Sequence, residues 1–198
     1  MSKLRFSLFA LVCAGVLAAA ATLAVGTKPA SGGGKHHGPS VSRDVRQMLH
    51  EVSPRNIQQT DHKLVSFGTR HTLSSQTDPN RGIGAATEWV YEQLQQDAAA
   101  SGGRMTVEKQ SFVQPAGPRI PVPTTITNVI ATLHGSQTES AGRTYVVSGH
   151  LDSRVTDVLN AISDAPGADD DASGVAVVLE LARVMAIPYA EADKVAKL

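Results

Sequence analysis

The chain has 198 residues, with 18 Lys and Arg balanced by 18 Asp and Glu, and 41% of its residues are hydrophobic. This length is typical of one domain, and the zero formal net charge argues against a nucleic-acid-binding protein. The single Cys excludes a disulfide framework and a zinc site built from cysteines.

The N-terminal segment has the pattern of a secretory signal peptide. Lys3 and Arg5 precede a largely apolar run over residues 8–25, and small alanines crowd the end of that run. We expect a signal peptide over residues 1–26 and a flexible Gly-, Ser- and Pro-rich linker over residues 27–40. The mature protein would then be secreted, without a stable membrane partner. A retained membrane anchor is the alternative, because an apolar run of about 18 residues nearly spans a bilayer.

Helical patterns follow the linker. Apolar residues at helical spacing predict a helix near residues 45–52, and Ser53-Pro54 has the residue types that begin a second one. The strongest pattern covers residues 82–100 and ends at Gly102-Gly103, and a last helix follows Gly174. The residues expected to face the core from these helices are Ile57, Leu64, Val65, Ile83, Ala86, Val90, Leu94, Val175, Val178, Leu179 and Ala182.

Three segments have strand character. Residues 104–113 alternate, residues 125–133 are rich in β-branched side chains, and Thr144–Ser148 is a short apolar run, as expected of a buried strand. Prolines between residues 115 and 123 mark an irregular connection. Helices flanking buried strands predict an α/β sandwich.

Acidic residues are concentrated after the predicted buried strand. Six acids and one cation give a net charge of −5 over residues 152–171, in a chain of zero net charge. Such close carboxylates repel one another unless they are solvated or bind a cation. His150 directly follows the strand, and ligand sites of open α/β sheets lie beyond the carboxyl ends of strands. The acids are Asp152, Asp157, Asp164, Asp169, Asp170 and Asp171.

The sequence His150-Leu151-Asp152 has a specific chemical interpretation. Residues i and i+2 of an extended chain project to the same side, so Asp152 can accept a hydrogen bond from one ring nitrogen of His150. The other nitrogen is then oriented as a metal ligand. The acidic run before Ala172-Ser173-Gly174 adds a carboxylate that could bridge two metal ions. Imidazole with carboxylate suits zinc best, with manganese or cobalt as alternatives.

These motifs resemble those of a known enzyme family. His150-Leu151-Asp152-Ser153, followed by Ala165-Pro166-Gly167-Ala168-Asp169-Asp170-Asp171-Ala172-Ser173-Gly174, is similar to the signature of the two-zinc exopeptidases of metallopeptidase family M28, the bacterial leucyl aminopeptidase type. The resemblance covers roughly residues 45–187 and includes the segments Phe67-Gly68-Thr69-Arg70, Gly82-Ile83-Gly84-Ala85-Ala86 and Thr127-Asn128-Val129-Ile130-Ala131.

The resemblance implies a fold and a role for each matching residue. The fold would be a three-layer α/β/α sandwich with a mixed, mainly parallel sheet, of the phosphorylase/hydrolase-like type. His150 would bind one zinc ion, Asp152 would orient His150, and Asp170 would bridge two zinc ions. Asp169 and Asp171 would be supporting residues. The reaction would be removal of N-terminal residues from peptides or proteins.

The resemblance also implies residues that do not occur in the sequence up to Leu198. The family's Gly-Glu-Glu motif supplies a general-base glutamate and a zinc ligand, and two further ligands follow it. None of these is found after Asp171. We therefore expect residues 41–198 to be the N-terminal part of a catalytic domain that is incomplete at its C-terminus and inactive alone, because a catalytic zinc needs about three protein ligands.

Alternative functions remain. A non-catalytic secreted fragment or a metal-binding module, for calcium or a single zinc ion, is the main alternative. A calcium loop has some support, because five residues fall at EF-hand ligand or turn positions: Asp169, Asp171, Ser173, Gly174 and Glu180. Apolar Val175–Leu179 and the Pro166-Gly167 pair argue against it. A serine hydrolase lacks its Gly-x-Ser-x-Gly motif.

Two polar residues near the motifs permit more than one interpretation. Arg70 and His71 could line a substrate pocket, or Arg70 could tie its loop to main-chain carbonyls. Ser153 is expected to serve in loop packing.

Overall fold

The computed structural model describes residues 43–195, so the predicted signal peptide and linker lie outside the described residues. The chain first forms two helices, α1 (Arg43–Glu51) and α2 (Pro54–Ser66). The predicted boundary between them is confirmed, since Ser53 is the N-cap of α2 and its Oγ accepts a hydrogen bond from the Asn56 amide at 3.2 Å. Pro54 occupies the first helical position, where a missing amide hydrogen costs nothing.

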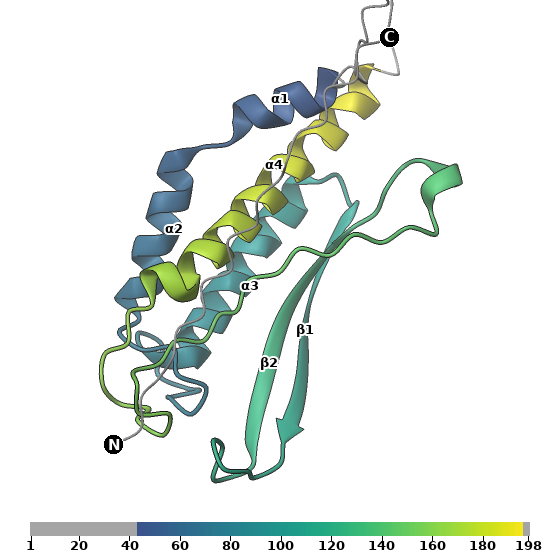
Figure 1. Cartoon of the computed structure of the whole chain (residues 1–198). Coiled ribbons are helices and arrows are strands. Elements are labelled where there is room, and N and C mark those ends of the chain that lie inside the picture. The colour runs from purple at the N-terminus through teal and green to yellow at the C-terminus, as the bar shows by residue number, and fades with distance from the viewer. Residues whose placement is uncertain (1–42, 196–198) are drawn as a thin grey trace, which may run out of the picture. The chain divides into compact units, whose positions relative to one another are not determined.

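Two longer helices form the core with α2. Helix α3 (Gly82–Ala100) has the predicted bounds, and α4 (Ser173–Val195) begins where the acidic run ends. In Figure 1 the three helices pack side by side, with α4 between α2 and α3. Residues with small side chains at the contacts, among them fully buried Ala86 and Ala172, permit this close packing. The buried cluster is Leu64, Phe67, Ala85, Ala86, Val90, Leu94, Ala172, Val175 and Leu179.

The two predicted strands form an antiparallel hairpin. Strands β1 (Met105–Gln114) and β2 (Thr124–Leu133) pair from Met105 opposite Leu133 to Gln114 opposite Thr124. Alternate residues of the hairpin, Val107, Val129 and Ala131, pack against the helical core. The irregular, proline-rich connection lies between the strands as expected, and Figure 1 shows the hairpin running beside α3.

The third predicted strand is wrong. Thr144–Ser148 forms no β-ladder, and Tyr145 and Val146 are 84% and 83% exposed. A short apolar run becomes a buried strand only when neighbouring strands satisfy its main chain and cover its faces. No strand lies alongside this segment within residues 43–195, so the run stays extended in the connection between β2 and α4.

The fold class is therefore confirmed only at its coarser level. The described chain mixes helices with strands, but its sheet has two strands and is antiparallel, where the prediction was a mainly parallel sheet. The physical reason is the same: the parallel strand expected at Thr144–Ser148 has no partner among the described residues. The three-layer sandwich remains a prediction.

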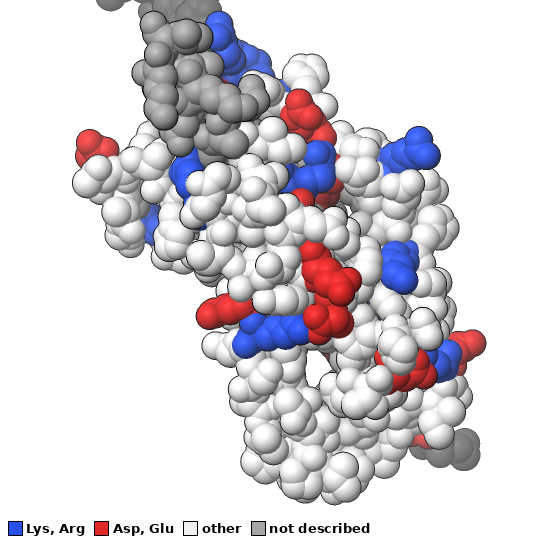
Figure 2. Space-filling model, turned by 180° about the vertical axis from the view of Figure 1, so that it is seen from behind, with Lys and Arg blue, Asp and Glu red and all other residues white. Residues whose placement is uncertain are grey.

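The described surface carries charges of both signs. On the face in Figure 2, acidic and basic side chains are interspersed, and no continuous basic area is visible on that face. Within residues 43–195, no helix is both long enough and apolar enough to cross a membrane.

Candidate metal centre

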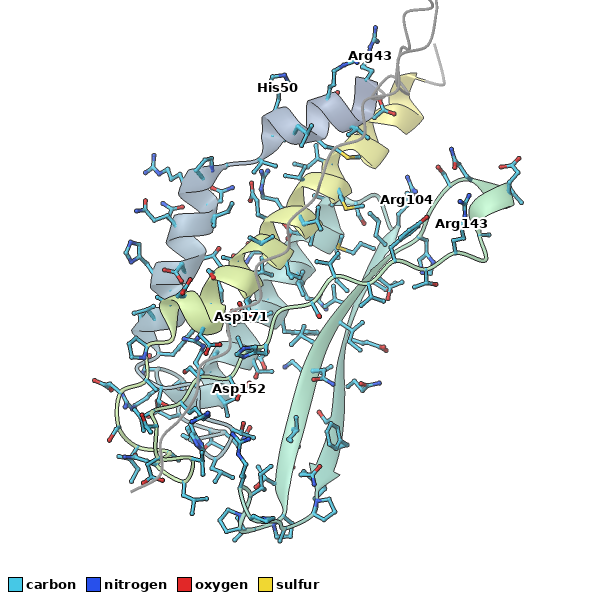
Figure 3. The ribbon with its side chains drawn as sticks, viewed as in Figure 1. Arg43, His50, Arg104, Arg143, Asp152 and Asp171 are labelled. Atoms are coloured by element: carbon cyan, nitrogen blue, oxygen red, sulfur yellow. The ribbon has the colours of Figure 1, made fainter. Side chains whose placement is uncertain are left out.

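The predicted site residues gather where the connection after β2 meets the start of α4. His150 and Asp152 come from the irregular segment before α4, and the acidic run forms η2 (Ala168–Ala172), a single turn that leads into the helix. Figure 3 shows Asp152 and Asp171 near the first turn of α4. The structure thus brings together two segments that the sequence separates by an exposed loop.

The two ring nitrogens of His150 have different surroundings. Nε2 lies 3.0 Å from Oδ1 of Asp170. Nδ1 lies 3.1 Å from the main-chain oxygen of Asp152 and 3.4 Å from its carboxylate Oδ1. The nearer acceptor for Nδ1 is therefore the Asp152 carbonyl rather than the carboxylate that was expected to orient the ring. Either acceptor places the hydrogen on Nδ1 and leaves Nε2 directed at Asp170.

The electrostatic surroundings of His150 favour positive charge. Burial alone would lower the pKa of His150. The Asp152 carbonyl and the carboxylates of Asp152, Asp171 and Asp170 act in the opposite direction, and together they raise this pKa. A cation other than the proton would experience the same negative field, so the arrangement suits a bound metal ion.

The three consecutive aspartates have distinct geometries. The backbone leaves helical conformation at Asp170 (φ −121°, ψ 90°) and Asp171 (φ −133°, ψ 39°), which directs their carboxylates differently. Asp171 accepts hydrogen bonds from the amides of His150 (3.0 Å) and Gly174 (3.1 Å). The side chain of Asp170 is 89% exposed beside His150. The main-chain oxygen of Asp169 accepts a hydrogen bond from the Ser173 hydroxyl. Asp170 thus has the more accessible carboxylate, and Asp171 joins the two segments.

The donor pair His150 Nε2 and Asp170 Oδ1 fits one zinc ion. Ligand atoms on a tetrahedral zinc with bonds of about 2.0–2.2 Å are roughly 3.3 Å apart. The observed separation of 3.0 Å differs from this by a few tenths of an ångström. No group of three or more His, Cys, Asp or Glu side chains suited to a metal occurs among the described residues. His150 and Asp170 are therefore two candidate ligands, short of the three that a catalytic zinc usually takes from protein.

The calcium-binding loop, considered as an alternative from the sequence, does not form. Glu180 would be its last ligand, but its carboxylate accepts hydrogen bonds from the Ser53 amide at 2.6 Å and from Arg183 at 2.8 and 2.9 Å. Glu180 is buried in α4 and ties that helix to the start of α2. Arg183 and the other donors lower the pKa of Glu180 against the effect of burial, which alone would raise it. Glu180 is a structural residue, and the calcium interpretation loses its bidentate ligand.

A cavity of about 250 Å³ opens at the His150–Asp170 pair. A second cavity of about 240 Å³ shares Asp152 and Arg154 with it, and His71 lines this second one. His71 is buried, with Nδ1 accepting the Leu73 amide at 3.0 Å and Nε2 3.1 Å from the Val158 carbonyl. The residues around the first cavity are His150, Asp152, Ser153, Arg154, Val155, Thr156 and Asp170.

The sequence left the role of Arg70 open, and the structure decides it. Arg70 is 1% exposed, and its guanidinium donates to four main-chain carbonyls rather than lining either cavity. Ser153 is buried as expected and donates to the Ala165 carbonyl at 2.6 Å. A buried arginine leaves no periodic pattern in a sequence, so its motif context was the only available signal.

Comparison with known proteins relates the chain to metallopeptidases. Residues 128–194 match the sequence profile described as Peptidase family M28. A "Probable zinc metalloprotease" of Pyrenophora teres f. teres (strain 0-1) is 58% identical over 142 residues, which are 72% of this chain and 29% of that protein. A protein of the same description from Leptosphaeria maculans is 52% identical over 148 residues, 75% of this chain and 34% of the relative.

A more distant relative has a more specific name. "Leucine aminopeptidase 1" of Chaetomium globosum is 29% identical over 147 residues, covering 74% of this chain and 32% of that protein. The chain thus spans about a third of the length of the curated relatives it matches. The resemblance indicated by the motifs at His150 and Asp169–Asp171 is confirmed, since residues 128–194 match Peptidase family M28.

Proposed function

We propose that this chain supplies part of the metal site of a secreted M28-type zinc aminopeptidase that removes N-terminal residues from peptides or proteins. The observation that carries the proposal is the convergence of His150 Nε2 and Asp170 Oδ1 at 3.0 Å, with Nδ1 occupied by Asp152. The names of the relatives support zinc, and the distant leucine aminopeptidase supports the exopeptidase class.

Each residue of the site has a defined part in this proposal. His150 and Asp170 would hold the metal, and Asp152 would keep the hydrogen on Nδ1 so that Nε2 could donate its lone pair to the metal. Asp171 fixes the main chain of His150 through its amide. Zinc supplies the Lewis acidity that activates water and polarises the scissile carbonyl. The exposed position of Asp170 is compatible with a carboxylate that contacts two ions, which is the arrangement we propose.

The described residues account for only part of a catalytic site. A zinc ion with two protein ligands keeps the remaining positions for water and binds weakly. We propose that the general base and the further ligands lie in the part of the longer protein that corresponds to the remaining two thirds of the relatives. On this proposal the 198-residue chain binds zinc weakly and does not hydrolyse peptides.

A zinc titration of the 198-residue chain tests the proposal. The experiment uses a chain with His36→Asn and His37→Asn, because these adjacent linker histidines could also bind metal. We expect one weakly bound zinc ion that His150→Ala removes. His62→Ala, which removes an exposed histidine of α2, is the matched control and should leave zinc binding unchanged. Calcium binding that displaces zinc, or zinc binding unaffected by His150→Ala, would contradict the proposal.

Activity is tested on the full-length natural protein. We expect it to release N-terminal leucine from a chromogenic amide, and His150→Asn to abolish that release. N-terminal sequencing of the protein recovered from the culture medium tests secretion and gives the cleavage position. An intracellular protein with an intact Lys3–Arg5 segment would refute the secretion part of the proposal.

A further inference from the structure

The loop that follows α2 places a charged side chain in the interior. Arg70 is 1% exposed, and it is the largest fully buried side chain among the described residues. A buried guanidinium is costly unless its N–H groups are hydrogen-bonded, so an arginine at such a position needs a compensating set of acceptors. The hydrogen-bond acceptors of Arg70 show which segments of the chain it holds together.

The main chain around Arg70 lies between the two segments of the candidate metal centre. The Ala165 amide donates to the Gly68 carbonyl at 2.8 Å, and the Ser153 amide donates to the Arg70 carbonyl at 3.3 Å. The Ser153 hydroxyl accepts from the Arg70 amide at 3.1 Å and donates to the Ala165 carbonyl at 2.6 Å. The segment Gly68–Arg70 thus joins the stretch containing His150 to the stretch before the acidic turn.

The guanidinium extends the same connection. Nε donates to the carbonyl of Leu151 at 2.8 Å, and Leu151 stands between His150 and Asp152. Nη1 donates to the carbonyls of Pro166 (2.8 Å) and Leu64 (2.9 Å). Nη2 donates to the Gly167 carbonyl at 3.0 Å, directly before the turn that carries Asp170. One planar group therefore contacts both ligand-bearing segments and the end of α2.

The packing at Gly167 is tight on the side of Arg70. Gly167 has a φ of +49°, and a Cβ there would lie 2.6 Å from the Ser153 Cβ and 3.1 Å from Nη2 of Arg70. Glycine permits this conformation and this close approach. The two segments can consequently meet the guanidinium with good hydrogen-bond distances on both sides.

The charge of Arg70 is balanced without direct ion pairs. Among the described residues no carboxylate forms an ion pair with Arg70, and the acceptors of its guanidinium are main-chain carbonyl oxygens. Burial lowers the pKa of Arg70, and the negative charges of Asp61, Asp152 and Asp171 oppose that effect. Two of these three acids belong to the metal-centre segments, so the buried cation also attracts their carboxylates.

We propose that Arg70 is a positioning residue for the metal centre, and that its four carbonyl hydrogen bonds hold His150 and Asp170 at ligand distance from each other. This inference rests on the proposed function. Lysine cannot replace arginine here, because one ammonium group cannot reach in three directions as the rigid guanidinium fork does. The charge alone is therefore insufficient for this role.

The test compares Arg70→Lys with Arg81→Lys in the 198-residue chain. Arg81 is the matched control, since its exposed guanidinium contacts the same connection at the Ile162 carbonyl and at Asp164, both at 2.7 Å. Two quantities are measured in each variant: the zinc affinity of the folded protein, and the hydrogen-exchange rate of the His150 amide, which donates to Asp171. The exchange rate reports on the junction of the two segments without any metal.

We expect Arg70→Lys to weaken zinc binding about 10- to 100-fold, the usual effect of removing a residue that orients metal ligands. We also expect faster exchange of the His150 amide in this variant. Arg81→Lys should change neither quantity. In an Asp170→Asn background, Arg70→Lys should have a smaller effect on zinc affinity, because the ligand pair that Arg70 positions is already broken.

The outcomes distinguish the two proposals. If the parent chain binds zinc through His150 and Arg70→Lys binds it equally well, the positioning role is overturned and the proposed function stands. If the parent chain binds no zinc but Arg70→Lys still accelerates exchange at His150, the proposed function falls and the structural connection through Arg70 stands. A lower thermal midpoint with unchanged zinc affinity and His150 exchange would reduce Arg70 to a stabilising residue and overturn the proposal.

Discussion

Two parts of the same connection between β2 and α4 behave in opposite ways. Residues 144–148 are apolar but exposed, and no strand pairs with them in the described structure. Residues 151–167 include the three acids Asp152, Asp157 and Asp164, yet Ser153 and Ala165 are buried and Arg70 donates hydrogen bonds to main-chain carbonyls at both ends of this stretch. A polar segment can thus be held in place by hydrogen bonds from one buried side chain to its main chain. An apolar segment becomes buried only when neighbouring elements pack against it.

The candidate metal centre lies in the hydrogen-bonded part of this connection. The contacts of the candidate ligand pair His150–Asp170 lie in the hydrogen-bonded part of the connection, where the His150 amide also donates to Asp171. The candidate ligand pair can therefore be brought together by local contacts while residues 144–148 remain unpaired. Four pairs of variants test this contrast between fixed and unpaired regions, beginning with the largest expected effect.

Replacing the buried arginine should destabilise the protein most. Arg70→Met removes the donors of four carbonyls and should lower the free energy of unfolding by about 3 kcal/mol or more, because each buried acceptor left unsatisfied costs about 1–3 kcal/mol. Urea denaturation measures the loss. Arg81→Met, which removes an exposed ion pair, should cost less than about 1 kcal/mol. Equal losses for the two variants would show that Arg70 contributes no more to the free energy of unfolding than the exposed Arg81 does.

The second pair of variants truncates a buried apolar residue of the helical core and an exposed residue of the unpaired segment 144–148. Leu64 is fully buried among the helices, and Leu64→Ala should cost about 2–5 kcal/mol because it leaves a cavity. Tyr145→Ala removes a larger side chain that is 84% exposed and should change stability by less than about 0.5 kcal/mol. Thermal or urea unfolding of both variants provides the check. A large loss for Tyr145→Ala would show that residues 144–148 are covered in solution.

The start of α2 should contribute a smaller amount. Ser53→Ala removes the hydroxyl that accepts the Asn56 amide, and N-cap losses of this kind cost about 1 kcal/mol. The Ser53 amide still donates to Glu180 in this variant, so the contact between α2 and α4 is retained. Urea unfolding measures the loss, and Ser66→Ala, near the other end of α2, is the matched control with a smaller expected effect.

The helical region also contains a pH-dependent element. Burial raises the pKa of Asp97 from 3.8 to about 6, with Glu180 adding to the shift and Arg183 opposing it. The folded state thus binds this proton more tightly than the unfolded chain, so the contribution of Asp97 becomes unfavourable as the pH rises from about 4 to about 6. Asp97→Asn should therefore raise stability at pH 7 by about 1 kcal/mol, since the carboxyl is half-exposed and partly screened.

The measurement is unfolding at several pH values. The parent and Asp97→Asn chains should differ at pH 7 and converge below about pH 4, where both states hold the proton. A difference that is constant over this range would show that Asp97 does not titrate as described. Asp164→Asn changes an exposed carboxylate of the connection and should have little effect at pH 7.

The local elements could be predicted from the sequence because their signals are local. The apolar spacing gave the bounds of α3, and Ser53-Pro54 marked the start of α2. The β-branched run at residues 125–133 predicted β2 (Thr124–Leu133) to within one residue. Helix caps and strand propensities depend on residues a few positions apart, which a single sequence contains.

The remaining features depend on residues far apart in the chain. The run Thr144–Ser148 has the composition of a buried strand. Its burial depends on neighbouring strands, and the sequence of the run itself does not determine whether these are present. The site residues could be located from the motif, while the acceptors of Arg70 could not, because they are carbonyls contributed by four different residues. Main-chain acceptors have no residue-type signature.

The most direct test of the account is the coordination of zinc in the 198-residue chain carrying His36→Asn and His37→Asn. X-ray absorption at the zinc edge gives the number of imidazole ligands. We expect one imidazole in a zinc coordination shell otherwise made of oxygen atoms, and loss of that imidazole in His150→Ala. A shell with two or more imidazoles, or one imidazole that survives His150→Ala, would contradict the claim that His150 and Asp170 form the metal centre.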